Sequence, residues 1–314
     1  MKIPVGVSAC VLGEEVRYDG GHKRHRFVTD ELSRWFAYVP VCPEVAIGLG
    51  IPRPTIRLVE EDGQIHVRGT QDSSLDVTDK MHQFADQKLP TLTHLCGYVV
   101  CAKSPSCGME RVPVFSEGNP QGEKRGVGLW TARLMEAMPW LPVEENGRLQ
   151  DIMLRENFVM RVFALHDFYQ SLPEDAPADA YVRFHTRYKY TLMAASQQAA
   201  AELGRLIASV GTSAGPQFWR AYRQGFMDAL KTVVTRRQHT NVLMHLQGYF
   251  KKVLPGEEKA ELTRLIHAYR NGEAPLMAVL SVIRHLLVRH PQSYLADQHY
   301  LNPYPADLKL RVEL

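Results

Sequence analysis

The sequence predicts an α/β fold: a Rossmann-like domain with a mostly parallel sheet, followed by an all-α domain. Within residues 1–150, short apolar runs alternate with helical patterns, and this alternation is typical of βαβ units. Beyond residue 181 the apolar residues recur at helical spacing, and no strand pattern competes. A polar, proline-bearing segment at 171–180 has the composition of a linker. We therefore expect a first domain at 1–150, a helix and linker at 151–180, and a helical domain at 181–314.

Three strands of the first domain are expected to deliver cysteines to one edge of the sheet. The carboxyl ends of parallel strands line one edge, where ligands usually bind, so thiols far apart in sequence can meet there. The apolar runs 3–9, 38–41 and 98–102 precede, in that order, Cys10, Cys42 and a turn at 103–108 that carries Cys107.

The segments between and after these strands carry their own signals. Asp62-Gly63 between two strand-like runs indicates a two-residue hairpin, and Thr29 or Asp30 can cap a short helix. The other expected elements of the first half are helices at 28–36, 77–92, 129–138 and 149–169, strands at 56–61 and 64–68, and a glycine-rich loop at 118–128. In the second half we expect helices at 181–209, 216–252, 257–269 and 275–289, and an extended tail at 294–314 packed on them.

Composition limits the class of protein. The chain has 314 residues, of which 45% are hydrophobic and 23% charged, as in soluble globular proteins. Its apolar runs are too short to cross a bilayer and its start lacks a secretory signal, so we expect a cytoplasmic protein without a membrane partner. The five cysteines form no dense disulfide framework, which favours reduced thiols available to a metal.

Charge is distributed unevenly along the chain. Residues 1–180 carry 19 Lys and Arg against 25 Asp and Glu, a net charge of −6, whereas residues 181–314 carry 18 against 9, a net charge of +9. This asymmetry favours a polyanionic partner for the second half. The alternative is an uneven solvated surface, since a basic balance alone is a weak signal for nucleic-acid binding.

The three cysteines at strand ends favour a metal or cluster site over ordinary buried thiols. Cys96 and Cys101, within or next to the third strand, are expected to be ordinary buried thiols. Zinc would need a fourth ligand, for which His66, His94 and Glu44 are candidates, and the sequence has no close Cys-x-x-Cys pair to support it. Soft thiolates also suit a 4Fe-4S cluster, in which three cysteines leave one iron open. Glu44, two residues after Cys42, is then a candidate general acid or base, although a surface carboxylate is the ordinary interpretation.

These motifs resemble those of the bacterial thiouracil desulfidases. The resemblance covers roughly the first 150 residues and rests on Ser8-Ala9-Cys10, Gly13, Arg17-Tyr18-Asp19-Gly20, Cys42-Pro43-Glu44 and Lys103-Ser104-Pro105-Ser106-Cys107-Gly108. It implies an oxygen-sensitive 4Fe-4S cluster held by Cys10, Cys42 and Cys107, whose open iron takes the substrate's sulfur. Glu44 would activate the attacking water, and Ser104, with Lys103, would hydrogen-bond the base. For Ser104 a turn residue that satisfies its own backbone is an equal alternative.

The second half resembles a helical domain of formerly unknown function. The resemblance rests on residues 184–189, 239–250 and 300–305. Fused behind the desulfidase domain, this half resembles enzymes that remove sulfur from 4-thiouridine in transfer RNA, which makes thiolated tRNA the expected partner. The candidate RNA contacts are Arg183, His185, Lys189, Arg236, Arg237, Lys251 and Lys252, interleaved with the aromatic residues Phe184, Tyr188, Tyr190, Tyr249 and Phe250. Under the alternative interpretation most of these aromatic residues, and His185, belong to the core.

The leading hypothesis is therefore non-redox desulfuration of 4-thiouridine in tRNA to uridine, with release of hydrogen sulfide. A salvage desulfidase for free thiouracil or thionucleosides would use the same chemistry. A nucleic-acid-binding protein with structural zinc and an iron-sulfur redox sensor are alternatives of other classes. Glu44 and the lack of a fourth cysteine ligand favour catalysis over a closed structural site.

Overall fold

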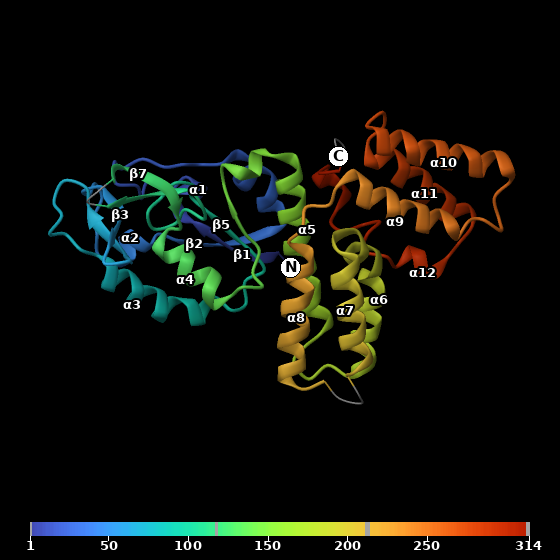
Figure 1. The fold of residues 1–314 in the computed structure, drawn as a ribbon, viewed down its shortest axis with the longest axis horizontal. Helices are drawn as coiled ribbons and strands as arrows, with labels where there is room; N and C mark the ends of the chain where they lie inside the picture. Colours follow the sequence, from blue (N-terminus) through green and yellow to red (C-terminus); the bar gives the residue numbers. More distant parts are fainter. Residues whose placement is uncertain (1, 117–118, 211–213, 312–314) are drawn as a thin grey trace. The chain divides into compact units, whose positions relative to one another are not determined.

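The computed structural model of the chain describes residues 2–116, 119–210 and 214–311 (Figure 1). It divides into two compact units, Met1–Gln150 and Asp151–Leu314, here called the α/β unit and the helical unit. The helix and linker expected at 151–180 thus lie within the helical unit rather than between two domains.

A four-stranded parallel sheet forms the centre of the α/β unit. Its order is β2-β1-β5-β8, and all three pairings are parallel, which confirms the predicted fold class. The strands are β1 Ile3–Ser8, β2 Phe36–Val41, β5 Tyr98–Val100 and β8 Val143–Glu145. Val5, Val7 and Val99 are completely buried, as expected for a sheet covered on both faces. The sequence analysis did not predict β8, because two of its three residues are glutamates.

The strand order places a topological switch point between β1 and β5. From β1 the chain moves outward to β2 and later returns to the other side of β1 for β5 and β8. Short helices follow the first two strands directly: α1 Ala9–Leu12 and α2 Pro43–Ala46. In open α/β sheets a ligand crevice lies at the carboxyl ends of the strands beside such a switch point.

A second, mixed sheet has the order β4-β3-β6-β7. The predicted hairpin is confirmed as β3 Ile56–Glu61 and β4 Gln64–Gly69, whereas β6 Val112–Ser116 was not predicted. The glycine-rich loop predicted at 118–128 is wrong for residues 119–126, which form strand β7 Asn119–Gly126, paired antiparallel with β6; Gly118 lies outside the described residues. Charged, exposed side chains hide the strand pattern in β7, which pairs on one side only.

The remaining segments of the α/β unit are mostly as predicted. Helices α3 Thr78–Lys88 and α4 Leu129–Ala137 confirm the predictions and pack against each other (Figure 1). The regular helix predicted at 28–36 is wrong. A π-helical turn at Phe27–Glu31 and a 3-10 turn at Leu32–Arg34 replace it, because Phe36 already belongs to β2.

The helical unit contains no strand among its described residues, in agreement with the prediction. Its helices are α5 Ile152–Ser171, α6 Ala178–Ala195, α7 Gln197–Ala208, α8 Pro216–Leu230, α9 Arg236–Gly248, α10 Gly256–Asn271, α11 Leu276–Arg289 and α12 Ser293–Ala296. Two predicted helices, 181–209 and 216–252, are each divided in two. Ser196 caps α7, and Thr235 with Gln238 forms a capping box at the start of α9. Across the described residues, no helix is both long and apolar enough to span a membrane.

The C-terminal tail packs on the helices, as predicted, but it is not extended throughout, since α12 covers Ser293–Ala296 and a 3-10 turn covers Ala306–Leu308. Tyr300 and Leu301 are buried in the core that α9, α10 and α11 share. Arg311 Nε donates to Glu156 Oε1 of α5 at 2.7 Å, and its Nη1 donates to the Tyr300 carbonyl at 2.7 Å. His239 of α9 lies 2.8 Å from the Tyr300 hydroxyl. Arg311 and Glu156 thus tie the tail to the first helix of the unit.

We predict that the helical unit loses stability as the pH falls below about 6.5. Burial, with the nearby charge of Arg311, lowers the pKa of His239 to about 3. Between pH 6.5 and 3, His239 is therefore protonated in the unfolded chain and neutral in the folded chain. The free energy of unfolding decreases as the pH falls through this range, by up to ~1.4 kcal/mol per pH unit for one such group. Urea unfolding midpoints between pH 7 and 4 should fall less steeply for His239→Asn. An equal pH slope in the variant would contradict this assignment.

Candidate functional site

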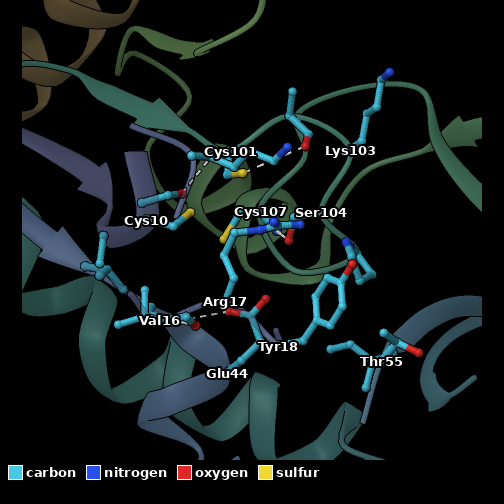
Figure 2. Close-up of a pocket in the computed structure, with 18 of the residues that line it drawn as sticks. Cys10, Val16, Arg17, Tyr18, Glu44, Thr55, Cys101, Lys103, Ser104 and Cys107 are labelled. Atoms are coloured by element: carbon cyan, nitrogen blue, oxygen red, sulfur yellow. Dashed lines mark hydrogen bonds between the residues drawn. The ribbon is translucent and has the colours of Figure 1, made fainter. Parts of the chain in front are cut away.

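A cavity of about 530 Å³ lies at the carboxyl ends of β1, β2 and β5 (Figure 2). Its lining comes from the segments that follow these strands, together with the loop after β8 and the segment before β3. The lining residues with chemically active side chains are Ser8, Cys10, Arg17, Tyr18, Lys23, Cys42, Glu44, Arg53, Thr55, Cys101, Lys103, Ser104, Cys107 and Asn146. The structure therefore brings together the predicted ligands and catalytic residues of the first 150 positions, namely Cys10, Cys42, Glu44, Lys103, Ser104 and Cys107.

Each of the three predicted cysteine ligands is presented by a different strand exit. Cys10 lies in α1, immediately after β1, and is half-buried. Cys42 is the residue before α2 and is also half-buried, whereas Cys107 lies in the loop after β5 and is buried. Figure 2 shows Cys10 and Cys107 with their sulfur atoms turned toward the same space.

Ser104 shapes the loop that carries Cys107. Its hydroxyl oxygen accepts the backbone N–H groups of Ser106 at 3.2 Å and Cys107 at 3.1 Å, and its carbonyl accepts the N–H of Gly108 at 2.8 Å. This is the turn-forming role that the sequence allowed as an alternative. Two N–H donors occupy the acceptor positions of the hydroxyl, so its remaining hydrogen-bonding capacity toward the cavity is the O–H itself. The two roles of Ser104 are thus compatible.

The N-terminus of α4 closes this loop from behind. The N–H groups of Leu129 and Trp130 donate to the carbonyls of Pro105 and Ser106, at 3.1 and 3.0 Å. The first N–H groups of a helix have no hydrogen-bond acceptor within the helix. The loop carbonyls therefore accept hydrogen bonds from N–H groups of α4 that would otherwise lack an acceptor. Gly128 is required at this contact, because a Cβ there would lie 2.5 Å from the Ser106 carbonyl.

Three polar residues to which the sequence analysis gave no role fix the cavity walls. Ser8, 2% exposed, accepts the N–H of Cys101 at 3.1 Å. Glu145 accepts the N–H of Met109 at 2.8 Å, and Asn146 accepts the N–H of Ala102 at 3.0 Å. Glu145 and Asn146 belong to the strand and turn that the sequence did not reveal. The sequence feature that could have revealed them is the pair of consecutive acidic residues, Glu144 and Glu145, which follows an apolar segment that includes Pro142.

Cys101 is buried, as predicted, but it is not remote from the site. It lines the same cavity as the three predicted ligands, and its thiol, which donates to the Ala102 carbonyl at 3.9 Å, lies beside that of Cys10. Cys96 is buried away from the cavity lining, and burial raises its pKa to about 12. Cys96 is therefore an ordinary buried thiol, as expected, whereas Cys101 is part of the cavity lining. The reason is that β5 ends at Val100, so Cys101 is the first residue after the strand, at the edge of the sheet.

The electrostatics of the cavity hold its ligand thiols in the protonated form. Burial and the Glu44 carboxylate raise the pKa of Cys42 to about 11. Burial, with the charge of Glu44, also raises the pKa of Cys107 well above its usual value, and the hydrogen bond with Cys101 followed by burial raises that of Cys10. Thiolates form in such a site only when a cation takes the place of the thiol protons. A cationic metal group that binds the sulfur atoms is such a cation. The donor set, several thiols around one cavity, fits an iron-sulfur cluster.

The zinc alternative finds no support in the arrangement of side chains. Neither His66 nor His94 lines the cavity. Within the residues that the structure describes, no group of three or more His, Cys, Asp or Glu side chains converges to hold one metal ion. Glu44, the third candidate, does line the cavity. It is 9% exposed in the first turn of α2, and its Oε2 accepts the Cys42 thiol at 3.4 Å.

Four cations contribute to the cavity lining. These are Arg17, Lys23, Arg53 and Lys103, and Glu44 is the one carboxylate among the described lining residues. Arg17 also pairs with Asp19 at 3.2 Å. Arg53 is used structurally, since its Nη1 donates to the Val16 carbonyl at 2.9 Å. This excess of positive charge favours a substrate with negative charge close to the reacting atom.

The predicted RNA-contacting residues fall into two groups in the helical unit. Arg183, His185 and Lys189 lie on α6, where Arg183 pairs with Asp179. The His185 ring lies 3.1 Å from the Tyr222 hydroxyl, and burial lowers its pKa, which suits a structural role better than a phosphate contact. Exposed Arg236 and Arg237 begin α9, and exposed Lys251 and Lys252 follow its end. Arg236 also has a structural contact, because its Nη1 donates to the Tyr269 carbonyl at 3.2 Å.

Most of the aromatic residues proposed to stack on RNA bases are core residues. Phe184, Tyr188, Tyr190 and Phe250 are at most 3% exposed, so that role is wrong for them. Tyr249 is 37% exposed and stacks on Tyr294, with ring centroids 5.8 Å apart. The Lys189 ammonium lies 5.9 Å from the Tyr294 ring, so part of the α6 group adjoins the end of α9.

Comparison with known proteins gives matches to two family models and to two curated relatives. Residues 5–146 match the family described as 2-thiouracil desulfurase, and residues 189–305 match one described as a protein of unknown function, DUF1722. The uncharacterized protein YbgA of Escherichia coli (strain K12) is 34% identical over 157 residues, 50% of this chain and 93% of YbgA. YbbK of Bacillus subtilis (strain 168), also described as uncharacterized, is 31% identical over 157 residues, 47% of this chain and 98% of YbbK.

One solved structure is also similar, a 4Fe-4S-dependent thiouracil desulfidase named TudS. It has 30% sequence identity and a TM-score of 0.38, over 48% of this chain and 94% of that chain. The family match and the curated relatives, together with the motifs that surround the cavity, confirm the resemblance: the chain belongs to the 2-thiouracil desulfurase family.

Proposed function

We propose that this protein is a 4Fe-4S-dependent desulfidase that replaces the sulfur of a thiolated uracil base by oxygen and releases hydrogen sulfide. The observation that carries the proposal is the meeting of Cys10, Cys42 and Cys107 at one cavity, with the carboxylate of Glu44 beside them. Family membership supports the reaction class, and the TudS title supports the cofactor. When bound by three thiolates, such a cluster supplies a Lewis-acidic iron with affinity for sulfur.

The residues of the chain supply the other parts of the reaction. Glu44 is held in the first turn of α2 and can orient a water molecule and accept its proton. The hydroxyl of Ser104 can donate to the base where negative charge develops, because two N–H groups already occupy its acceptor positions. Lys103 is exposed at the cavity and adds positive charge there. Taken together, these side chains bind, orient and transfer protons without a net redox change.

The proposed substrate is 4-thiouridine carried by tRNA. Two features support RNA over a free base. One is the excess of cations around the cavity, and the other is the set of exposed basic residues at both ends of α9, with the Tyr249 and Tyr294 rings at its C-terminal end. Cations bind phosphates while exposed rings can stack on splayed bases. Counted by structural unit, residues 151–314 carry 20 Lys and Arg against 15 Asp and Glu, and residues 1–150 carry 17 against 19. The helical unit is thus the basic one, and we assign it the tRNA.

A salvage desulfidase for free thiouracil or thionucleosides is the second candidate. The cavity itself favours it, since all of its lining residues belong to the α/β unit. For either substrate the reducing cytoplasm suits the five free cysteines and an oxygen-sensitive cluster.

The first test concerns the cluster. Protein purified without oxygen should contain about four irons per chain and absorb broadly in the visible range. Replacing Cys10, Cys42 or Cys107 by Ser should abolish both properties, because each removes one thiolate ligand. Cys96→Ser is the matched control and should keep them. Stoichiometric zinc without visible absorption would contradict the proposal.

The second test concerns proton transfer. Glu44→Gln preserves the size of the side chain and removes its basicity, so turnover should fall about 100-fold or more while iron content is unchanged. Ser104→Ala should cost less activity. Hydrogen sulfide release and iron should be measured on the same samples, so that a loss of cluster is not mistaken for a loss of catalysis. Normal turnover of Glu44→Gln would remove this residue from the mechanism.

The third test separates the two substrates. Reversing Arg236 and Arg237 to Glu in the full chain should weaken tRNA binding and flatten its dependence on salt, because fewer counterions are released. Activity on free 4-thiouridine should stay unchanged. The matched control reverses Lys231 and Arg264, which already form ion pairs with Asp228 and Glu261. Equal tRNA binding by wild type and the Arg236 and Arg237 variant would favour the salvage function.

A further inference from the structure

The cavity contains one thiol more than the proposed ligand set uses. Cys101 lines it together with Cys10, Cys42 and Cys107. The sequence resemblance gives Cys101 no role, and a core thiol would have no need to lie at a ligand cavity. Figure 2 shows Cys101 and Cys10 side by side at the upper wall of the cavity.

The strand register explains why these two cysteines are neighbours. β1 pairs with β5 in parallel, Val7 opposite Val99, so the residues leaving the two strands emerge together. Ser8 Oγ accepts the N–H of Cys101 at 3.1 Å and fixes that position. Continued past the strand ends, this register sets Ala9 opposite Cys101, and Cys10 is the next residue of the chain. Neighbouring strands lie about 4.8 Å apart, which is of the same order as the roughly 4.4–6.8 Å between the Cα atoms of a disulfide.

The four thiols differ in their partners. Cys42 donates to Glu44 Oε2 at 3.4 Å and lies 3.8 Å from the Val16 carbonyl, and the Cys101 thiol donates to the Ala102 carbonyl at 3.9 Å. The Cys10 thiol lies beside the Cys101 thiol. Of the pairs that could be joined around this cavity, Cys10 and Cys101 are the pair already in contact.

We propose that Cys10 and Cys101 form a reversible disulfide when the cysteines carry no cluster, and that Cys101 thereby protects Cys10 from irreversible oxidation. Cys10 is half-buried and Cys101 is buried, so a small disulfide such as oxidised glutathione reaches Cys10 first. The Cys10 thiol loses its proton as its sulfur attacks one glutathione sulfur, and the other glutathione takes up that proton and leaves as a thiol. Cys101 then attacks the Cys10 sulfur and releases the second glutathione. Two protein thiols lose two electrons, and one glutathione disulfide gains them.

The protective purpose rests on the proposed cluster function, because a Cys10 oxidised beyond the sulfenic acid could no longer bind iron. The chemistry of the pair does not depend on the desulfidase reaction. Iron content before oxidation therefore reports on the proposed function, and the position of the disulfide reports on this inference.

The test uses the full-length protein purified without oxygen, together with Cys101→Ser and the control Cys96→Ser. Each sample is exposed to air and oxidised glutathione until the visible absorption is lost, alkylated under denaturing conditions, and digested without reductant for mass spectrometry. Wild type and Cys96→Ser should show the peptides of Cys10 and Cys101 linked in most chains. Cys101→Ser should instead show Cys10 joined to glutathione or oxidised to the sulfinic or sulfonic acid.

Recovery provides the second readout. After a thiol reductant, iron and sulfide are added, wild type should regain most of its cluster absorption, and Cys101→Ser should regain several-fold less. A different linkage, such as Cys10 to Cys107, or no linkage in wild type would overturn the proposal. Equal recovery of wild type and Cys101→Ser would overturn the protective role. If the Cys101→Ser variant fails to fold, the position of the disulfide in the wild-type protein still tests whether Cys10 and Cys101 become linked.

Discussion

The parallel pairing of β1 with β2 on one side and β5 on the other is the constraint on which the site depends. Because β1 is central, the segments after all three strands emerge at one edge, and residues 10, 42 and 101–107 surround one cavity. Gly6 makes this pairing possible. A Cβ there would lie 2.2 Å from the ring of Tyr98, which is completely buried against the strand. Close packing of one aromatic ring thus determines where the thiols meet.

A cavity built from loops must satisfy the backbone groups that those loops bury. The chain does so with side chains that are distant in sequence: Ser8 and Asn146 accept N–H groups of residues 101 and 102, and Glu145 accepts that of Met109. Thr131 of α4 donates to the Cys107 carbonyl at 2.7 Å. The ligand loop is therefore held on both sides before any metal arrives, which lowers the cost of ordering it on binding.

The helical unit is stabilised differently. Its aromatic residues form the core rather than a binding surface, and the buried ion pair of Arg311 with Glu156 ties the tail to α5. A buried pair of this kind is a weak source of net stability, but removing one partner leaves an uncompensated charge. The basic residues that remain exposed lie at the ends of α9, where long side chains reach solvent. Exposure therefore reduces the number of candidate phosphate contacts, although exposed Arg236 also donates a hydrogen bond to the Tyr269 carbonyl within the fold.

The sequence alone determined the fold class, the two kinds of secondary structure and the three cysteine-bearing strand ends. These depend on local periodicity and on the rule that parallel strands end at one edge, and both are readable from a chain without coordinates. Tertiary structure alone decided the second sheet, in which charged β7 is a strand only because β6 pairs with it. It also decided that Cys101 belongs to the site, that four of five candidate aromatic residues are core, and that Glu145 and Asn146 support the ligand loop. The physical reason is the same in each case: pairing, burial and hydrogen bonding join residues far apart in sequence, and local composition records none of them.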